Sequence, residues 1–138
     1  MPNRIHLKGP FQLDELDATE TITPGQLLER TSAGKVAKNT DLDLPAEALF
    51  AQEDALQGKT IDDDYVADDK VQVLIPAKGS EVFAFLQGGV TAADGIELSS
   101  GGDGTLVLAT TTDFVIAVAQ EALDLNALPA ARLAVRVV

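Results

Sequence analysis

The chain has 138 residues, a net charge of −12 and no cysteine, so it is one domain with neither a disulfide nor a thiolate metal site. The acidic balance repels phosphate backbones, which argues against nucleic acid as a partner. The apolar run Phe114–Ala119 is far shorter than the roughly 20 residues of a membrane span, and the N-terminus lacks an apolar signal-peptide core, so neither membrane nor secretory targeting is expected.

The first residues form a weakly basic segment without helical periodicity. Met1–Phe11 carries Arg4, His6 and Lys8 and ends near Gly9-Pro10, which predicts an extended arm or an edge strand. The polar, threonine-rich stretch that follows leads into a strand. We therefore expect residues 1–21 to be an N-terminal arm with a lead-in strand, and residues 22–138 to be a single β-rich domain.

Two similar blocks then appear 70 positions apart. In the first, Thr23–Glu29 leads to Gly34-Lys35-Val36, and in the second, Ala93–Leu98 leads to Gly104-Thr105-Leu106. Each block runs from one glycine to another nine positions later, with a leucine in the middle and an apolar residue at the close. This spacing predicts a strand, a tight turn and a return strand, written twice.

The middle of the chain contains one ambiguous segment and one clear pair of strands. Glu47–Leu56 has the composition of a helix, but Ala48–Ala51 could equally form a short buried strand. Val71–Ile75 is rich in β-branched residues, and Val82–Leu86 follows it after Lys78-Gly79-Ser80. We expect these two strands to form a hairpin with glycine in its loop.

The C-terminal third adds further short strands. We expect them at Leu106–Ala109, within Phe114–Leu123 and at Leu133–Val138. The last of these either pairs between subunits or closes a barrel within one chain. Regular short strands with turns predict a mainly β fold: a small β-barrel or sandwich (β-tulip-like) with an extended N-terminal arm and little helix.

The acidic charge is concentrated in residues 41–69, which hold ten acids and only Lys59. A solvated loop is the favoured interpretation of such a block. Asp62-Asp63-Asp64 and Asp68-Asp69 lack the alternating ligands and central glycine of an EF-hand loop, so no metal site is expected. Whether the block holds a cation stays open at this point.

No pattern of residues indicates catalysis or a cofactor. Gly101–Leu106 resembles the glycine-rich nucleotide loop of certain kinases, but a β-prone segment follows it where those folds need a helix. Lys35 follows a turn, as in biotinyl and lipoyl carriers, yet Gly34 and Val36 flank it where biotin carriers have methionines. His6 is the only histidine and has no orienting partner nearby in the sequence. We therefore expect no enzyme activity, no cofactor and no catalytic residue.

The chain as a whole resembles the small capsid decoration proteins of tailed bacteriophages, also called head-stabilising or cement proteins. The residues that carry the resemblance span roughly 22–138, and their order matters more than any single fragment. They are Pro24–Glu29, Gly34–Val36, Ala48–Asp54, Gly58-Lys59, Tyr65–Val73, Gly79–Val82, Asp103–Leu106 and Ala134–Val138.

This resemblance implies a non-enzymatic protein on the outer surface of the virion capsid, where it binds the major capsid protein and stabilises the assembled head. It also implies self-association, with a trimer favoured and a dimer as the alternative. The charge split suggests that the basic N-terminus contacts the shell, with Arg4, His6, Lys8 and Phe11 as the candidate capsid-contact residues. The alternative function is a soluble β-domain that serves as an adaptor or carrier for a protein or a small ligand.

Overall fold

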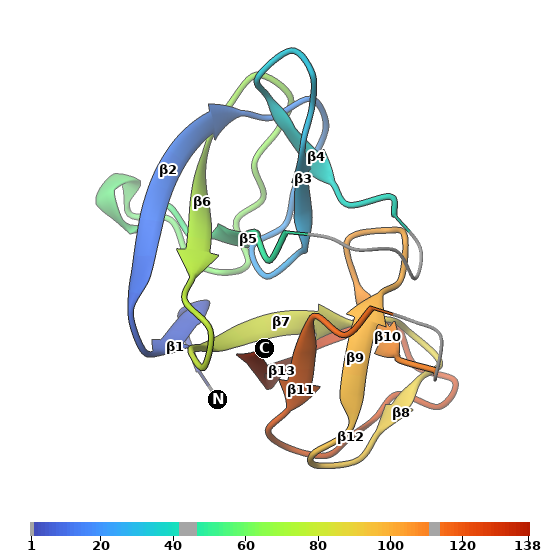
Figure 1. The fold of residues 1–138 in the computed structure, drawn as a ribbon. Helices are drawn as coiled ribbons and strands as arrows, with labels where there is room; N and C mark the ends of the chain where they lie inside the picture. Colours follow the sequence, from blue (N-terminus) through green and yellow to red (C-terminus); the bar gives the residue numbers. More distant parts are fainter. Residues whose placement is uncertain (1, 42–46, 111–113) are drawn as a thin grey trace.

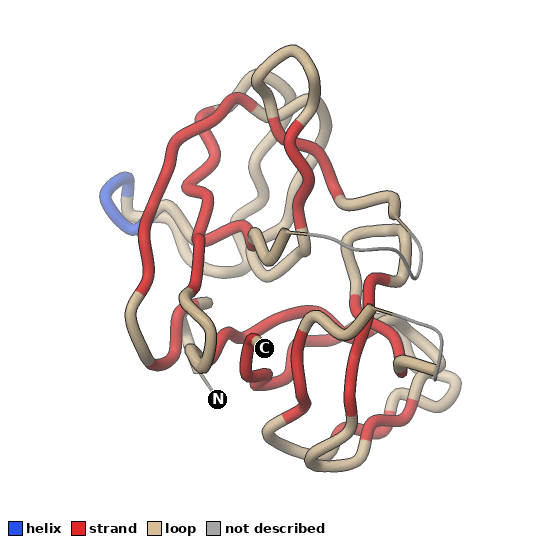
Figure 2. The backbone as a smooth tube through the Cα atoms, viewed as in Figure 1, coloured by secondary structure: helices blue, strands red, loops and turns tan. Residues whose placement is uncertain are grey.

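The computed structural model describes residues 2–41, 47–110 and 114–138. Almost all regular structure in them is β, and the single helical element is the 3₁₀ turn η1 (Ala55–Gln57), as Figure 2 shows. The strands are β1 (His6–Lys8), β2 (Phe11–Asp17), β3 (Leu28–Arg30), β4 (Val36–Lys38), β5 (Phe50–Gln52), β6 (Lys70–Pro76), β7 (Glu81–Leu86), β8 (Thr91–Ala92), β9 (Glu97–Ser100), β10 (Leu106–Leu108), β11 (Ala117–Ala119), β12 (Leu123–Asp124) and β13 (Ala131–Val137). The predicted mainly β fold with little helix is confirmed.

Five strands of the C-terminal half close into a small barrel, which we call the second ring. Its order is β7-β10-β9-β11-β13, and β13 returns to pair with β7 along its whole length (Figure 1). All pairings are antiparallel except that of β10 with β7, which is parallel. The terminal strand β13 therefore closes a barrel within its own chain, which settles the alternative that the sequence left open.

The N-terminal half forms a comparable ring from β2, β6, β5, β3 and β4, which we call the first ring. The sheet β2-β6-β5 and the hairpin β3-β4 supply its walls. Two single-residue bridges join these walls: Leu27 pairs with Phe50, and Ala18 pairs in parallel with Val36. In Figure 1 the two rings lie one above the other, the first drawn in blue to green and the second in yellow to red.

The second ring repeats the first strand by strand and in the same register. The parallel pair Ala18 and Val36 corresponds to Leu86 and Leu106, displaced by 68 and 70 positions. The same displacements carry the antiparallel pair of Phe50 and Leu27 onto that of Val118 and Glu97, and a displacement of 62 carries β6 onto β13. The hydrogen bonds recur as well, each of the following at 2.8 Å: Gly25 N to Ala51 O and Gly95 N to Ala119 O, Thr31 N to Lys35 O and Gly101 N to Thr105 O. The chain is thus a structural duplication.

Backbone conformation marks the same correspondence. Only two non-glycine residues in the described part of the chain have positive φ, Asp68 at 71° and Ala127 at 59°. Each occupies the same place in a turn that precedes the last strand of its ring. Such a conformation is unfavourable for a residue with a Cβ atom. A turn of the same kind therefore recurs before the last strand of each ring, although Ala127 stands three positions earlier than the displacement of 62 between β6 and β13 would give.

Two clusters of buried apolar side chains stabilise the molecule. One fills the first ring: Ala18, Ile22, Leu28, Val36, Leu49, Ala51, Tyr65, Val71 and Val73. The other fills the second ring and also takes in Ile5, Leu27, Phe50 and Leu74 from the N-terminal half. Strand β6 is therefore apolar on both faces, because Val71 and Val73 enter one core and Leu74 enters the other. Complete burial of a side chain such as Phe50 contributes about 1.5–3 kcal/mol.

The predicted hairpin between Val71–Ile75 and Val82–Leu86 is wrong, although both strands exist. β6 pairs with β2 and β5, whereas β7 pairs with β1, β10 and β13. The turn at Lys78-Gly79-Ser80 directs the chain from one ring into the other. Gly79 there donates to the carbonyl of Val137 and not to a partner across a hairpin.

Other expectations are confirmed or narrowed. Both glycine-spaced blocks form the predicted hairpins, β3-β4 and β9-β10. The ambiguous segment Glu47–Leu56 forms the buried strand β5 before η1 begins, and the strand expected within Phe114–Leu123 is limited to β11. A solvated loop was favoured for residues 41–69; residues 42–46 lie outside the described residues, and the remainder contains β5 and η1.

The predicted N-terminal arm is extended, and it forms edge strands of the fold. β1 pairs with β7 at Val82 and Glu81, and β2 pairs with all seven residues of β6. Ile5, just before β1, is fully buried, and its amide donates to a carboxylate oxygen of Glu53 at 3.1 Å. Residues 1–21 and 22–138 therefore share sheets and a core. The predicted boundary between two parts stays a prediction.

Candidate interaction site

Three of the four candidate contact residues meet at the corner where β1 turns into β2. The rings of His6 and Phe11 lie 4.1 Å apart between centroids, and His6 Nε2 lies 2.7 Å from the carbonyl oxygen of Gly9. Lys8 is largely exposed and lies 3.9 Å from a carboxylate oxygen of Glu81. We call this surface the N-terminal corner. It presents an aromatic pair and a cation to solvent.

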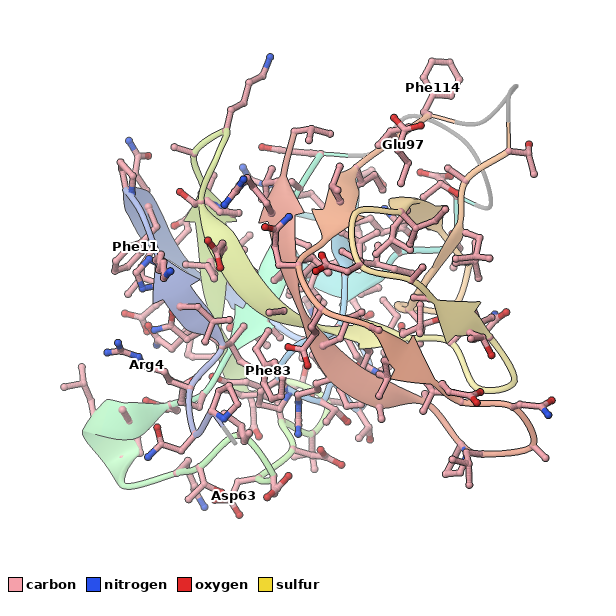
Figure 3. The ribbon with its side chains drawn as sticks, turned by 90° about the horizontal axis from the view of Figure 1, so that it is seen from below. Arg4, Phe11, Asp63, Phe83, Glu97 and Phe114 are labelled. Carbon is pink, nitrogen blue, oxygen red and sulfur yellow. The ribbon has the colours of Figure 1, made fainter. Side chains whose placement is uncertain are left out.

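Arg4 is exposed and precedes the buried Ile5 in the chain. It lines a groove of about 1340 Å³ between the two rings, together with Phe83, Phe85 and Arg132. In Figure 3 Arg4 and Phe11 lie on one side of the molecule, and Glu97 and Phe114 lie on the other. His6 and Phe11 are therefore in contact, with Lys8 on the same short strand, whereas Arg4 belongs to the lining of the groove on the same side of the molecule.

Beyond the corner, β2 exposes an open backbone edge that the sequence reasoning missed. The amide of Ala18 donates to Asp69 on the β6 side, so alternate residues counted back from Ala18 also face β6. The amides of Leu13, Glu15 and Asp17 therefore point away from the sheet. That of Glu15 is bonded to the carboxylate of the adjacent Asp14 at 3.0 Å.

The side chains along this edge are apolar first and acidic later. Phe11 is 42% exposed and Leu13 is 47% exposed, whereas Asp14, Glu15 and Asp17 follow them toward the end of the strand. Asp17 is bonded to Lys70 at 2.9 Å. That hydrogen bond lowers the pKa of Asp17 and raises the pKa of Lys70.

The ion pair between Asp17 and Lys70 has an equivalent pair in the second ring, and that pair is covered by the first ring. Asp17 and Lys70 are register partners in β2 and β6, and their equivalents Phe85 and Arg132 are partners in β7 and β13. The guanidinium of Arg132 lies 4.6 Å from the centre of the Phe85 ring, and it donates to the carbonyls of Pro24 and Ile61. An ion pair thus occupies the exposed position, and a cation–π pair occupies the position that the other ring covers.

A second hollow, of about 580 Å³, lies on the first ring beside β6. Its lining includes Glu15, Lys70, Gln72, Asp63 and Asp69. Burial raises the pKa of the Tyr65 hydroxyl at its base, and that hydroxyl donates to the carbonyl of Gln52. Among the residues that the structure describes, no group of three or more histidine, aspartate or glutamate side chains is placed to hold a metal ion.

The alternative sites weighed from the sequence fall on hairpin turns. Gly101–Thr105 forms the turn between β9 and β10, so a strand follows it, as predicted, and not a helix. Lys35 stands at the equivalent turn of the first ring, with its ammonium group 3.6 Å from Asp68. No helix in the described parts of the chain is long and apolar enough to cross a membrane.

The geometry defines a class of protein: a tandem of two five-stranded β-rings with an open edge strand at the N-terminal corner. No protein-family model matches the chain, and no curated protein matches it in sequence. A solved structure does, described as the crystal structure of the head fiber gp8.5 N base in bacteriophage phi29. The TM-score is 0.63 at 14% sequence identity, and the match covers 94% of this chain and 95% of that chain. At this identity the likeness establishes a shared fold.

Proposed function

We propose that this protein is a non-enzymatic decoration protein of a tailed-phage head. It binds the outer surface of the shell and stabilises the assembled lattice of major capsid protein. The observation that carries the proposal is the match to the base of a phage head fiber, which extends over nearly the full length of both chains. The sequence resemblance to capsid decoration proteins leads independently to the same class of role.

The physical character of the molecule supports this proposal. Both rings have cores of buried apolar side chains, and the longest strands, β2, β6 and β13, are held by continuous pairing. A protein that reinforces a shell needs such rigidity, together with a surface that can contact a neighbour. The proposed contact is the N-terminal corner, His6, Lys8 and Phe11, with Arg4 at the margin of the adjacent groove.

The burial of Ile5 decides how the contact should be tested. A deletion of residues 1–11 would remove a fully buried side chain and the strand β1, so it would damage the fold as well as the surface. Substitutions at exposed positions avoid that problem. We choose Lys8→Glu with Phe11→Ser as the test variant and Leu128→Ser as the control, since Leu128 is 54% exposed on a distant turn.

The experiment is co-sedimentation of purified protein with expanded heads that lack decoration, with the amount bound per capsid subunit as the readout. We expect saturable binding at a simple ratio, a marked loss of affinity for the test variant, and unchanged binding for the control. Absence of saturable binding to any head would refute the decoration role. Equal binding of all three proteins would refute the N-terminal corner as the contact.

We also propose that the protein self-associates on the shell, as a trimer or else as a dimer. Sedimentation velocity of the free protein and counting of copies on decorated heads would test this. A protein that stays monomeric in both states would contradict it.

A further inference from the structure

We infer that the outer edge of β2 accepts an extended segment of another protein as an antiparallel strand, and that this segment is basic at its N-terminal end and apolar at its C-terminal end. The inference goes beyond the proposed function, because it concerns the open edge of β2, which shares only Phe11 with the N-terminal corner, and a specific kind of partner. It follows from the backbone of the two rings and from the charges along one strand.

The second ring shows how such an edge is occupied. Strand β7 is the equivalent of β2, and its outer amides have acceptors: Phe83 donates to the carbonyl of Ile5 at 2.7 Å, and Phe85 donates to that of Gly25 at 3.1 Å. The equivalent amides of β2 belong to Glu15 and Asp17. Strand β1 lies antiparallel beside β7, and no strand in the described part of the chain takes that place beside β2.

The duplication therefore supplies both the geometry and the direction of the missing strand. Backbone donors and acceptors along an edge strand form a template for pairing with another chain. The open edge extends over Phe11–Asp17. It ends there because the next outward amide, that of Thr19, already donates to the carbonyl of Val36 at 3.0 Å. A segment of about six residues would fill it.

The side chains of β2 select what can bind. Asp14, Glu15 and Asp17 lie toward the end of the strand, and Phe11 and Leu13 lie at its beginning. In an antiparallel pair, the first residues of the incoming segment face the end of β2. Opposite charges and paired apolar side chains stabilise such neighbours, so basic residues must come first and apolar residues must follow.

Charge also argues against a second copy of this chain as the occupant. The acids Asp14, Glu15 and Asp17 of one copy would repel those of another copy at this edge. Antiparallel pairing of β2 with itself about Asp14 or Glu15 would place identical carboxylates directly opposite each other, which is destabilising. A basic segment gains from the same acids.

The test uses the full chain labelled with ¹⁵N and a capped hexapeptide of three lysines followed by Val-Thr-Val. The matched probe is the reversed peptide, Val-Thr-Val followed by three lysines, which has the same charge and composition. We expect the first peptide to perturb the amides of Leu13, Glu15 and Asp17 in a saturable way. The reversed peptide should bind about tenfold more weakly, since its charged and apolar pairs are mismatched.

Two variants provide the control on the protein side. Asp14→Lys with Glu15→Lys should abolish the preference between the peptides and weaken the first peptide about tenfold. Asp94→Lys with Glu97→Lys makes the same change in net charge at exposed positions of the second ring and should leave binding unchanged.

Three outcomes would overturn the inference. One is the absence of localised shifts in β2 with either peptide. Another is equal binding of both peptides to both variants, which would indicate unspecific attraction between charges. The third is protection of the β2 amides that grows with protein concentration in the absence of peptide, which would make a second copy the occupant. None of these measurements involves phage heads. A negative peptide titration would therefore leave the proposed decoration role unaffected, and a negative co-sedimentation experiment would leave the inference about the β2 edge unaffected.

Discussion

Replacement of Arg132 by alanine should destabilise the protein more than any other single change of a charged residue, because this side chain joins the two rings. Its side chain is only 12% exposed. It extends from β13 in the second ring to the carbonyls of Pro24 and Ile61 in the first, and it stacks on Phe85. The perturbation therefore removes contacts between rings and leaves the walls of each ring intact.

The magnitude follows from the contacts. A hydrogen bond from a charged donor contributes about 1.5–3 kcal/mol, and two such bonds at the lower limit give about 3 kcal/mol. The cation–π contact adds about 0.5–1 kcal/mol. The bond to Asp62, whose side chain is 83% exposed, adds little because solvent screens it. We expect a loss of about 3–4 kcal/mol, which lowers Tm by about 12 °C for a chain of this length.

The assay is urea unfolding followed both by far-ultraviolet circular dichroism and by the fluorescence of Tyr65, which reports on the first ring and is the only tyrosine in the chain. Arg132→Lys keeps the charge but not the planar fork, so it should lose about half as much free energy. Arg136→Ala is the control on the same strand. Arg136 is half exposed and bonded only to Glu81, so its loss should cost less than about 1 kcal/mol.

If Arg132→Ala cost no more free energy of unfolding than Arg136→Ala, Arg132 would not join the two rings. If Arg132→Lys were as stable as the wild type, the charge alone would account for the effect and the planar guanidinium would contribute nothing. Separation of the circular dichroism and fluorescence transitions in Arg132→Ala would add that the side chain couples the two rings.

Three further changes have expected outcomes that can be measured by the same unfolding assay. Ile5→Ala should cost about 2–4 kcal/mol, because the side chain is fully buried ahead of β1; a cost below about 1 kcal/mol would show that the N-terminal segment does not contribute to the core. Ala127→Gly should stabilise the protein by about 0.5–1 kcal/mol, because glycine tolerates the φ of 59° that alanine resists; a loss of stability would contradict that view of the turn. Stability should decline as the pH falls below about 4. Hydrogen bonds hold three carboxyl pKa values below their usual range, so the stability that they contribute is present above the unfolded pKa and is lost as pH falls through the folded one. These carboxyls are Asp17, Asp63 and Asp124. Constant stability between pH 5 and about pH 2 would show that these bonds contribute nothing.

The duplication was partly visible in the sequence. The glycine-spaced blocks around Leu28 and Leu98 predicted both hairpins, because a hairpin depends on residues that are close in the chain. The remaining strands of each ring carry no such signal. β6 and β13 occupy equivalent places in the two rings, but their sequences are dissimilar. β6 is buried on both faces by two cores, whereas β13 lines a single barrel.

The candidate site was predicted only in part. Basic and aromatic residues near the N-terminus indicated a contact surface, and His6, Lys8 and Phe11 do lie together. Arg4 instead lines the groove between the two rings, and the burial of Ile5 next to it was not predicted. An edge strand was predicted only as far as Phe11, and the open edge of β2 beyond it was not, because an edge is defined by the absence of a partner strand.

Local sequence patterns account for the local elements, which are short β-prone runs and turns at glycine and proline. The pairing of the strands depends on the folded chain as a whole, in which β6 and β7 belong to different rings although they are neighbours in the chain. The physical reason is that turn geometry acts over a few residues. Strand pairing, in contrast, is decided by the burial of side chains from distant segments, here Ile5, Phe50 and Leu74 against the second ring.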